Sequence, residues 1–153
     1  MLSIIILAAG KGTRMKSDLP KVLQPMAGKA LLKHVVDSAR KLEPSKIIVV
    51  HGFGGDRVKA DFESHNDIDW VHQKEQLGTG HAVKQASKII SADDEILILY
   101  GDVPLISSSN LKQLLSENLK KRNKSFVSDT PRSIWIWKDC QKKRQYSSYH
   151  RRQ

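Results

Sequence analysis

The sequence predicts an α/β fold with a mostly parallel sheet and helices on both faces. Three short segments, residues 3–8, 46–50 and 95–100, are continuously apolar, as expected for strands buried on both sides. Segments with helical spacing of apolar residues alternate with strands through the first 120 residues. This βαβαβαβα order is typical of a parallel sheet with right-handed crossovers, in which ligands bind beyond the carboxyl ends of the strands.

The first half of the chain is predicted to form a strand, a loop, a helix and a second strand. The apolar run at residues 3–8 leads into LAAGKGTRMKSDLPK at residues 7–21, which has no apolar periodicity. Apolar residues then recur at helical spacing from Leu31 to Leu42. We expect this helix to end before Pro44, because a proline disfavours helical geometry in the residue before it.

The turn HGFGG at residues 51–55 follows the second strand, and a short helix is expected from Asp56 to about Glu63. Residues 69–72 form a weaker strand pattern between this helix and the next.

The next helix is predicted to start at residues 78–80, with Thr79 as its cap and Ile89 and Ile90 on its buried side. A last helix follows the strand at residues 95–100, and we expect Ser109 to cap it. Its apolar residues are Leu111, Leu114, Leu115 and Leu119.

Composition limits the domain organisation and the class of protein. With 153 residues the chain is long enough for one ordinary domain. Residues 120–153 hold 11 of the 26 Lys and Arg but only two of the 16 Asp and Glu, so the +10 charge belongs to the tail and the body is nearly neutral. Cys140 is the single cysteine and excludes an intrachain disulfide. No signal peptide or membrane span is expected, and a soluble cytoplasmic protein is the default.

The loop at residues 7–21 has the composition of an anion site. Small residues and glycines let backbone N–H groups approach a ligand closely. Its basic side chains include Arg14, whose planar guanidinium suits phosphate oxygens, and Lys11 and Lys21, which are mobile point charges. A P-loop spacing is absent, and a dinucleotide fingerprint would need glycine where the chain has Met15. Taken alone, both this loop and Asp102 before Val103 also fit ordinary turns.

Three segments, in the same order, resemble bacterial N-acetylglucosamine-1-phosphate uridyltransferases. They are LAAGKGTRMKSDLPKVL at residues 7–23, QKEQLGTGHAV at residues 73–83 and LYGDVPLI at residues 99–106. The resemblance covers roughly residues 3–122. It implies the N-terminal part of a Rossmann-like nucleotidyltransferase sheet over residues 1–122.

The resemblance also implies a binding site. Backbone and side-chain contacts to the uracil nucleotide would come from Leu7, Ala8, Ala9, Gly10, Gln73, Gly78 and Thr79. Arg14 and Lys21 would neutralise the triphosphate of UTP as catalytic residues. Tyr100 and Gly101 would lie close to the sugar and ribose, and Asp102 would hold Mg²⁺. His81 is expected to orient or cap rather than to act as a general base, and the other histidines of the body are expected to be structural or at the surface.

The implied reaction is attack of N-acetylglucosamine 1-phosphate on the α-phosphorus of UTP with release of pyrophosphate, a step in peptidoglycan and lipopolysaccharide precursor synthesis. Such catalysis depends mostly on positioning and charge neutralisation. Another sugar nucleotidyltransferase or a cytidylyltransferase could share the opening loop, but QKEQLGTGHA favours uridine and N-acetylglucosamine. Neither nucleic acid nor membrane is expected as a partner. The family oligomerises through a half that has no counterpart here, which leaves the oligomeric state open.

The tail at residues 123–153 has no family motif and no helical or alternating period, so an irregular basic segment is expected. A disordered tail and a nucleic-acid-binding arm with stacking aromatics are two interpretations. A third follows from the genetic code, because tryptophan has the single codon TGG. When the codons for Ile-Trp-Ile-Trp at residues 134–137 are read from their second base, two glycines are forced. With the codons that follow, this shifted frame permits the sequence YGYGRIV, which resembles a GYGRI loop of the family.

We therefore hypothesise an out-of-frame translation that begins between about Arg122 and Thr130. The family's later sugar-contacting residues and second metal ligand then have no counterpart, and no uridyltransferase activity is expected from this polypeptide alone. Gene sequencing that finds no restoring frame, or pyrophosphate release by the purified chain, would contradict these expectations.

Overall fold

The computed structural model describes residues 1–12, 15–120 and 134–137. The strands of the main sheet are β1 (Leu2–Ala8), β4 (Lys46–His51), β5 (Ile68–His72), β6 (Glu95–Tyr100) and β7 (Ile134–Trp137). The helices are α1 (Leu31–Arg40), α2 (Gly55–Ala60), α3 (Thr79–Ala86) and α4 (Ser108–Lys120). Short elements complete the chain: η2 (Lys21–Leu23), β2 (Pro25–Met26), β3 (Lys29–Ala30) and η3 (Ser87–Ile89).

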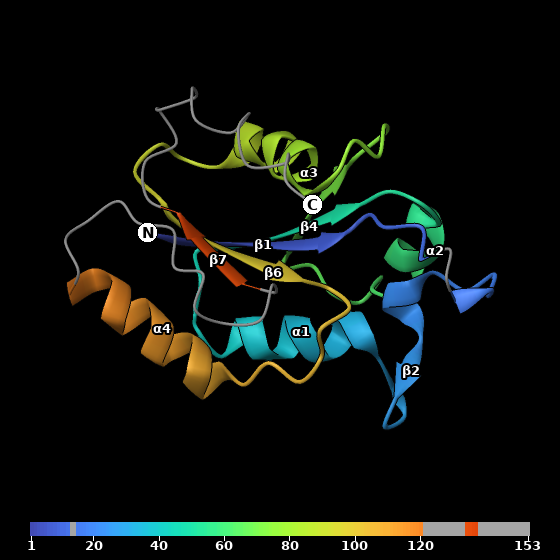
Figure 1. Ribbon diagram of the computed structural model, residues 1–153, viewed down its shortest axis with the longest axis horizontal. Helices are drawn as coiled ribbons and strands as arrows, with labels where there is room; N and C mark the ends of the chain where they lie inside the picture. The colour runs from blue at the N-terminus through green and yellow to red at the C-terminus, as the bar shows by residue number, and fades with distance from the viewer. Residues whose placement is uncertain (13–14, 121–133, 138–153) are drawn as a thin grey trace, which may run out of the picture.

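The main sheet has the order β5-β4-β1-β6-β7 (Figure 1). The first four strands of this order are parallel, with Ala8 opposite His51 and Leu7 opposite Tyr100. The predicted α/β fold with a parallel sheet is therefore confirmed. The chain moves from β1 to β4 and β5 on one side and returns to β6 on the other, so the order reverses around β1. In open parallel sheets such a switch point is where ligands bind, beyond the carboxyl ends of the strands.

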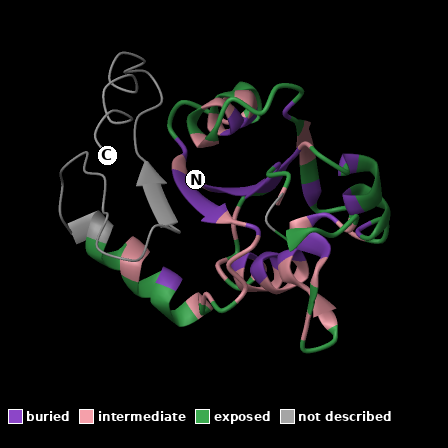
Figure 2. Ribbon diagram, turned by 45° about the vertical axis from the view of Figure 1, so that its right-hand side comes forward, coloured by how far each residue is buried: buried purple, intermediate pink, exposed green. Residues whose placement is uncertain are grey.

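Helices cover both faces of the sheet, as the alternation of buried residues along β1 requires. Ile4 and Ile6 pack with the buried face of α1, and with Val58 and Phe62, in one apolar cluster. Ile5 packs on the opposite face with the buried alanines of α3. Figure 2 shows the buried residues concentrated in the central strands and the inner side of α1. Burial on both faces explains why these strands are continuously apolar rather than alternating.

The prediction that the tail is irregular throughout is wrong for residues 134–137. This segment forms β7, which pairs antiparallel with β6, Leu97 opposite Ile136 and Leu99 opposite Ile134. Its β-branched and tryptophan residues have high strand propensity, which outweighs the lack of a polar alternation. The rest of the tail, including Cys140 and the proposed start of the frame change, lies outside the described residues.

Two predicted helix caps and one buried residue are corrected. Gly78, not Thr79, occupies the N-cap position of α3, and Thr79 is the first helical residue without a capping hydrogen bond. At α4 the hydroxyl of Ser107, not Ser109, accepts the N–H of Asn110, at 3.2 Å. Ile89 is exposed, because α3 ends at Ala86 and the chain tightens into η3. The observed caps lie one and two residues before the predicted ones, and the helix ends before it reaches Ile89.

The β2–β3 hairpin was not predicted. Its strands are two residues long, and the turn between them holds Ala27 and Gly28 at φ values of 48° and 75°. The positive φ at both positions is the geometry of a tight hairpin turn. Among the described residues, no helix is both long and apolar enough to cross a membrane.

Candidate functional site

The loop that follows β1 folds back tightly on residue 21. Gly12 has a φ of 60°, and a Cβ at this position would lie 2.8 Å from the Cβ of Lys21. The N–H of Met15 donates to the carbonyl of Gly12 at 2.9 Å, which closes the turn. Glycine at position 12 therefore permits both the left-handed backbone and the close approach of Lys21. Thr13 and Arg14 lie outside the described residues, so the predicted role of Arg14 stays a prediction.

Lys21 and Asp102 form an ion pair that joins the β1 loop to the end of β6. The N–H of Gly101 donates to the carbonyl of Leu7 at 2.9 Å, which extends the β1–β6 ladder to the residue before Asp102. A Cβ on Gly101 would lie 3.1 Å from the nearest side-chain carbon of Leu32. The lysine and aspartate side chains are 39% and 25% exposed, so the pair is reachable from solvent. The structure thus places two predicted site residues, 81 positions apart, in direct contact.

Gln73 lies at the end of β5 and is almost fully buried, with 3% of its surface exposed. Its backbone N–H donates to the carbonyl of His51 at 2.8 Å. Its side-chain Nε2 lies 3.2 Å from the carbonyl of Gly78 and 3.0 Å from Nδ1 of His81. Gly78 has a φ of 89°, which favours glycine. The side-chain amide of Gln73 therefore contacts both the turn that starts α3 and the ring of His81. The roles expected of Gln73 at the base and of His81 as an orienting or capping group stay predictions.

Gly52 connects these two parts of the site, and the sequence analysis treated it only as part of a turn. A Cβ at Gly52 would lie 2.9 Å from the carbonyl oxygen of Ala9 and 3.2 Å from Nε2 of Gln76. The loop after β4 is thus packed between the LAAG loop and the QKEQLGTG loop. The clustering of three glycines in HGFGG was the available signal, because glycines at the carboxyl end of a strand allow close backbone approach.

His51 ends β4 beside the candidate site and is 4% exposed. Neither ring nitrogen has a hydrogen-bond partner among the described residues. Its ring stacks on that of His72, with centroids 5.0 Å apart. Burial, with further contributions from Lys59 and His72, lowers the pKa of His51 to about 4. His51 is therefore a neutral, buried ring at pH 7, a structural residue as expected.

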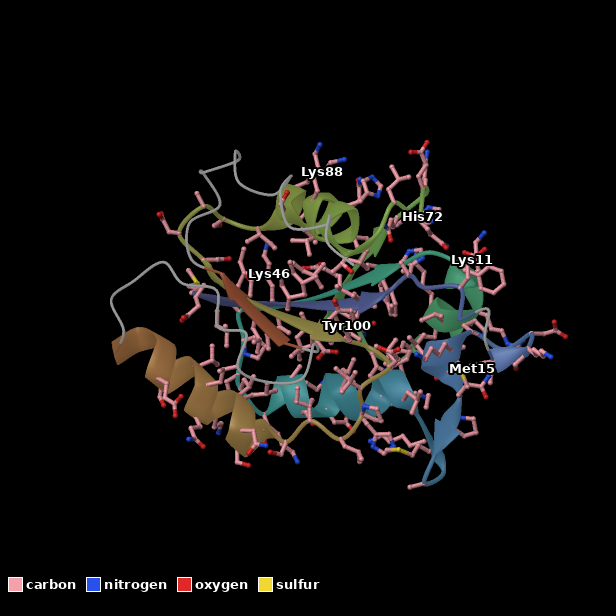
Figure 3. All side chains as sticks on the ribbon, in the orientation of Figure 1. Lys11, Met15, Lys46, His72, Lys88 and Tyr100 are labelled. Atoms are coloured by element: carbon pink, nitrogen blue, oxygen red, sulfur yellow. The ribbon has the colours of Figure 1, made fainter. Side chains whose placement is uncertain are left out.

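The remaining predicted residues share the same end of the sheet. Ala8 and Ala9 are buried, Gly10 is exposed, and Tyr100 is half-buried against the α3-side cluster. Figure 3 shows Lys11 and Met15 at the end of the molecule where His72 closes β5. Within the described ranges, no group of three His, Cys, Asp or Glu side chains converges as a metal site. A site built on Asp102 suits Mg²⁺ when substrate phosphates and water supply the other ligands.

This geometry joins a glycine-rich loop, a lysine–carboxylate pair and a glutamine-held turn at a topological switch point. The chain matches the family described as the MobA-like NTP transferase domain over residues 4–137. It belongs to this nucleotidyltransferase family. The match continues past residue 122, where the sequence resemblance ends, and includes β7. The predicted nucleotidyltransferase assignment is thus confirmed.

Curated relatives agree with the family. Residues of this chain are 56% identical over 114 positions to Bifunctional protein GlmU of Xanthomonas axonopodis pv. citri (strain 306), covering 74% of this chain. The corresponding protein of Stenotrophomonas maltophilia (strain K279a) is 54% identical over 116 positions, covering 76% of this chain. The chain spans about a quarter of the length of these relatives, 25% and 26%.

Solved structures share the fold. Rv0371c from Mycobacterium tuberculosis H37Rv superposes with a TM-score of 0.73 at 18% identity, covering 89% of this chain and 70% of that chain. HddC from Yersinia pseudotuberculosis superposes with a TM-score of 0.64 at 26% identity, and the match covers 78% of this chain and 55% of that chain. A UDP-glucose pyrophosphorylase complexed with UDP-glucose superposes with a TM-score of 0.66 at 22% identity, and the match covers 78% of this chain and 54% of that chain.

Proposed function

We propose that this nucleotidyltransferase domain binds UTP and belongs to an enzyme for uridylyl transfer to N-acetylglucosamine 1-phosphate, which forms UDP-N-acetylglucosamine and pyrophosphate. The chain by itself is expected to bind UTP without catalysing the transfer. The observation that carries the proposal is the contact between Lys21 and Asp102 across the β1–β6 switch point, next to the glycine-rich loop. A cationic nitrogen and a carboxylate side by side suit a triphosphate with its divalent ion. The 54–56% identity to the GlmU proteins and the motif at residues 73–83 favour uridine over other bases.

The proposed roles follow from where each residue lies. Backbone groups of residues 7–10 would border the nucleotide, and Gln73, Gly78 and Thr79 its base. Tyr100 and Gly101 would border the sugar and ribose. Lys21, with Arg14, would neutralise the triphosphate.

In the proposed reaction an oxygen of the sugar phosphate attacks the α-phosphorus while the bond to the β-phosphate oxygen breaks, so pyrophosphate leaves in line. This reaction needs no covalent nucleophile from the protein. Lys21 is positioned to neutralise charge that moves onto the leaving pyrophosphate, because among the described residues its ammonium contacts the side chain of Asp102 alone. Bound Mg²⁺, held by Asp102, would contribute further charge neutralisation. A cytoplasmic location is part of this proposal.

Calorimetric titration of the 153-residue chain with UTP, CTP and ATP tests the proposal, each with and without Mg²⁺. We expect UTP to bind with the highest affinity and Mg²⁺ to strengthen that binding. The variant Asp102→Asn should lose the Mg²⁺-dependent part, whereas Asp93→Asn, an exposed aspartate before β6, should retain it. Equal affinities for the three nucleotides, or Mg²⁺ dependence that survives in Asp102→Asn, would contradict the proposal.

A further inference from the structure

Pro20, Lys21 and Val22 form a short segment that crosses the carboxyl ends of three neighbouring strands, β4, β1 and β6. Each of these residues meets a glycine that follows a different one of the strands. A Cβ at Gly54, after β4, would lie 2.5 Å from Cγ of Pro20. A Cβ at Gly101, after β6, would lie 3.4 Å from Cγ1 of Val22. The segment is therefore supported at both ends, and Lys21 lies between the two supports.

Lys21 itself lies against the glycine that follows β1. A Cβ at Gly12 would lie 2.8, 3.5 and 3.6 Å from Cβ, Cγ and Cδ of Lys21. The first three carbons of the lysine side chain thus run along the backbone at Gly12, and the ammonium end extends to Asp102. A free lysine side chain populates many rotamers, and this contact restricts them. The support therefore reaches most of the way to the charged group.

The two ends of the segment are fixed by packing. Pro20 and Val22 are both buried, although residues 15–18 are exposed. The ring of Pro20 restrains its φ, which is −49°, and its carbonyl accepts the N–H of Leu23 at 2.9 Å. Val22 belongs to the apolar cluster that includes the buried face of α1. The backbone on both sides of Lys21 is therefore held by contacts that do not involve the lysine's charge.

We propose that Pro20 and Val22 are positioning residues that hold the ammonium of Lys21 where the phosphates of the nucleotide bind. This inference rests on the proposed function, in which Lys21 neutralises the triphosphate. Neither Pro20 nor Val22 needs to touch the nucleotide. A lysine that is held in place before the ligand arrives loses less entropy on binding. The affinity that Lys21 contributes should therefore depend on both supports.

A double-mutant cycle measures this dependence by calorimetric titration of the full chain with UTP. In the unmodified protein we expect Lys21→Met to weaken UTP binding about tenfold or more. In a Pro20→Ala background the same change should weaken binding only about twofold, because the lysine is no longer held. Val22→Ala should act in the same direction. Pro25→Ala, at an exposed proline of β2, is the matched control and should leave the effect of Lys21→Met unchanged.

Additive effects would overturn the inference. If Pro20 and Val22 serve only the stability of the fold, each replacement will weaken UTP binding by the same factor with and without Lys21. Urea unfolding of every variant shows whether the titrated protein is folded.

A second measurement needs no nucleotide. A carbodiimide joins an amine and a carboxylate that are in contact, forming an amide bond with loss of water, and mass spectrometry of peptides locates the bond. We expect a crosslink between Lys21 and Asp102 in the unmodified chain and in Pro25→Ala, with a yield about threefold lower in Pro20→Ala. An equal yield in all three proteins would contradict the role of Pro20. If the unmodified chain binds no UTP, the proposed function fails, whereas the crosslink still decides whether the segment positions Lys21.

Discussion

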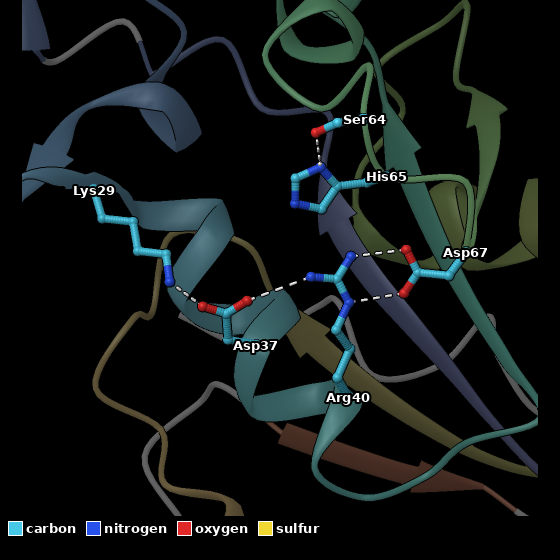
Figure 4. A network of polar contacts seen from close by, with 6 residues as sticks. All are labelled: Lys29, Asp37, Arg40, Ser64, His65 and Asp67. Carbon is cyan, nitrogen blue, oxygen red and sulfur yellow. Dashed lines mark hydrogen bonds and ion pairs between the residues drawn. The ribbon is translucent and has the colours of Figure 1, made fainter.

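The Lys21–Asp102 pair and the Arg40–Asp67 pair both join distant parts of the chain, but their support differs. Arg40 makes two hydrogen bonds of 2.7 Å to Asp67. Its other guanidinium nitrogen lies 3.4 Å from Asp37, which also pairs with Lys29 (Figure 4). These bonds raise the pKa of Arg40 and lower that of Asp67. For Lys21 and Asp102, by contrast, their mutual contact is the one side-chain bond that the described residues provide.

The Arg40–Asp67 pair therefore holds the fold together, whereas the Lys21–Asp102 pair is available to a ligand. The four-residue network fastens α1 to the loop before β5 with a bidentate geometry that is strong for an ion pair. The lysine–aspartate pair has a single contact on a flexible side chain, and a phosphate can replace the carboxylate as the lysine's partner. The ligand end of the molecule, formed by the carboxyl ends of β1, β4, β5 and β6 and the loops that follow them, also contains the tight approach of Gly52 to Ala9. It includes His51, whose two ring nitrogens have no hydrogen-bond partner among the described residues. We therefore expect substitutions at the two ends to have different effects on stability and on ligand binding.

The largest expected effect is an acid sensitivity of the ligand end that arises from His51. The folded protein binds a proton at His51 only near pH 4, whereas the unfolded chain binds it near pH 6.5. Lowering the pH from 7 to 4.5 therefore favours the unfolded state, by about 2 to 3 kcal/mol. Urea unfolding of the chain and of His51→Phe at both pH values measures this.

In His51→Phe the decrease in the free energy of unfolding between pH 7 and 4.5 should be smaller by about 2 to 3 kcal/mol. The lowered pKa of Asp94, caused first by the hydroxyl of Ser3 and opposed by burial, does not interfere. Its stabilisation is complete above about pH 4 and is lost only as the pH falls through its native pKa. If the two proteins lose the same free energy of unfolding between pH 7 and 4.5, the assignment of this acid sensitivity to His51 is contradicted.

A methyl group at Gly52 should destabilise the ligand end by about 1 to 2 kcal/mol, because it forces the backbone carbonyl of Ala9 to move. We expect Gly52→Ala to lower the urea midpoint and to weaken UTP binding. Gly80→Ala is the matched control, since a Cβ there meets nothing within 4 Å and alanine favours the helix. If Gly52→Ala is as stable as Gly80→Ala, the packing of the two loops is not as described.

Loss of the arginine from the α1 network should cost about 1 kcal/mol, as expected for a partly exposed bidentate pair. We expect Arg40→Met to show this decrease in urea unfolding at low salt. The decrease should shrink at 1 M salt, where charge interactions are screened. A decrease of the same size at both salt concentrations would assign the effect to packing of the side chain instead.

The smallest effect is expected at the neighbouring Lys33–Asp61 pair, where one nitrogen–oxygen contact of 3.1 Å joins two partly exposed side chains. Lys33 also lies 5.5 Å from the ring centroid of Phe62. We expect Lys33→Met to change stability by less than about 0.5 kcal/mol. A loss as large as that of Arg40→Met would remove the distinction between a bidentate network and a single pair.

Elements that are marked by runs of apolar residues were predictable from the sequence. Features that depend on contacts between segments distant in the sequence were not. The buried strands β1, β4 and β6 were predicted within one residue at each end, because an apolar run between turns admits few alternatives. The β2–β3 hairpin was missed because it has only two residues a strand. β7 was missed because residues 134–137 lack a polar alternation, although their strand propensity is high and β6 offers an edge to pair with.

The candidate site divides in the same way. Lys21, Asp102, Gln73 and Gly78 were predicted as site residues from motifs, and the structure brings Lys21 to Asp102 and Gln73 to Gly78. The contact of Gly52 with Ala9 depends on the separation of two loops, which no spacing along the chain encodes. That the ring nitrogens of His51 have no hydrogen-bond partner in the part of the chain that the structure describes is likewise a property of the packing around them.

The most direct test of the central claim compares Lys21→Met with Arg40→Met in a UTP titration and in urea unfolding. Both changes remove one cation and keep an unbranched side chain. We predict that Lys21→Met weakens UTP binding at least tenfold with little loss of stability, and that Arg40→Met loses stability with UTP affinity unchanged. UTP affinity that falls equally in both variants would contradict the assignment of the Lys21–Asp102 pair as the nucleotide site.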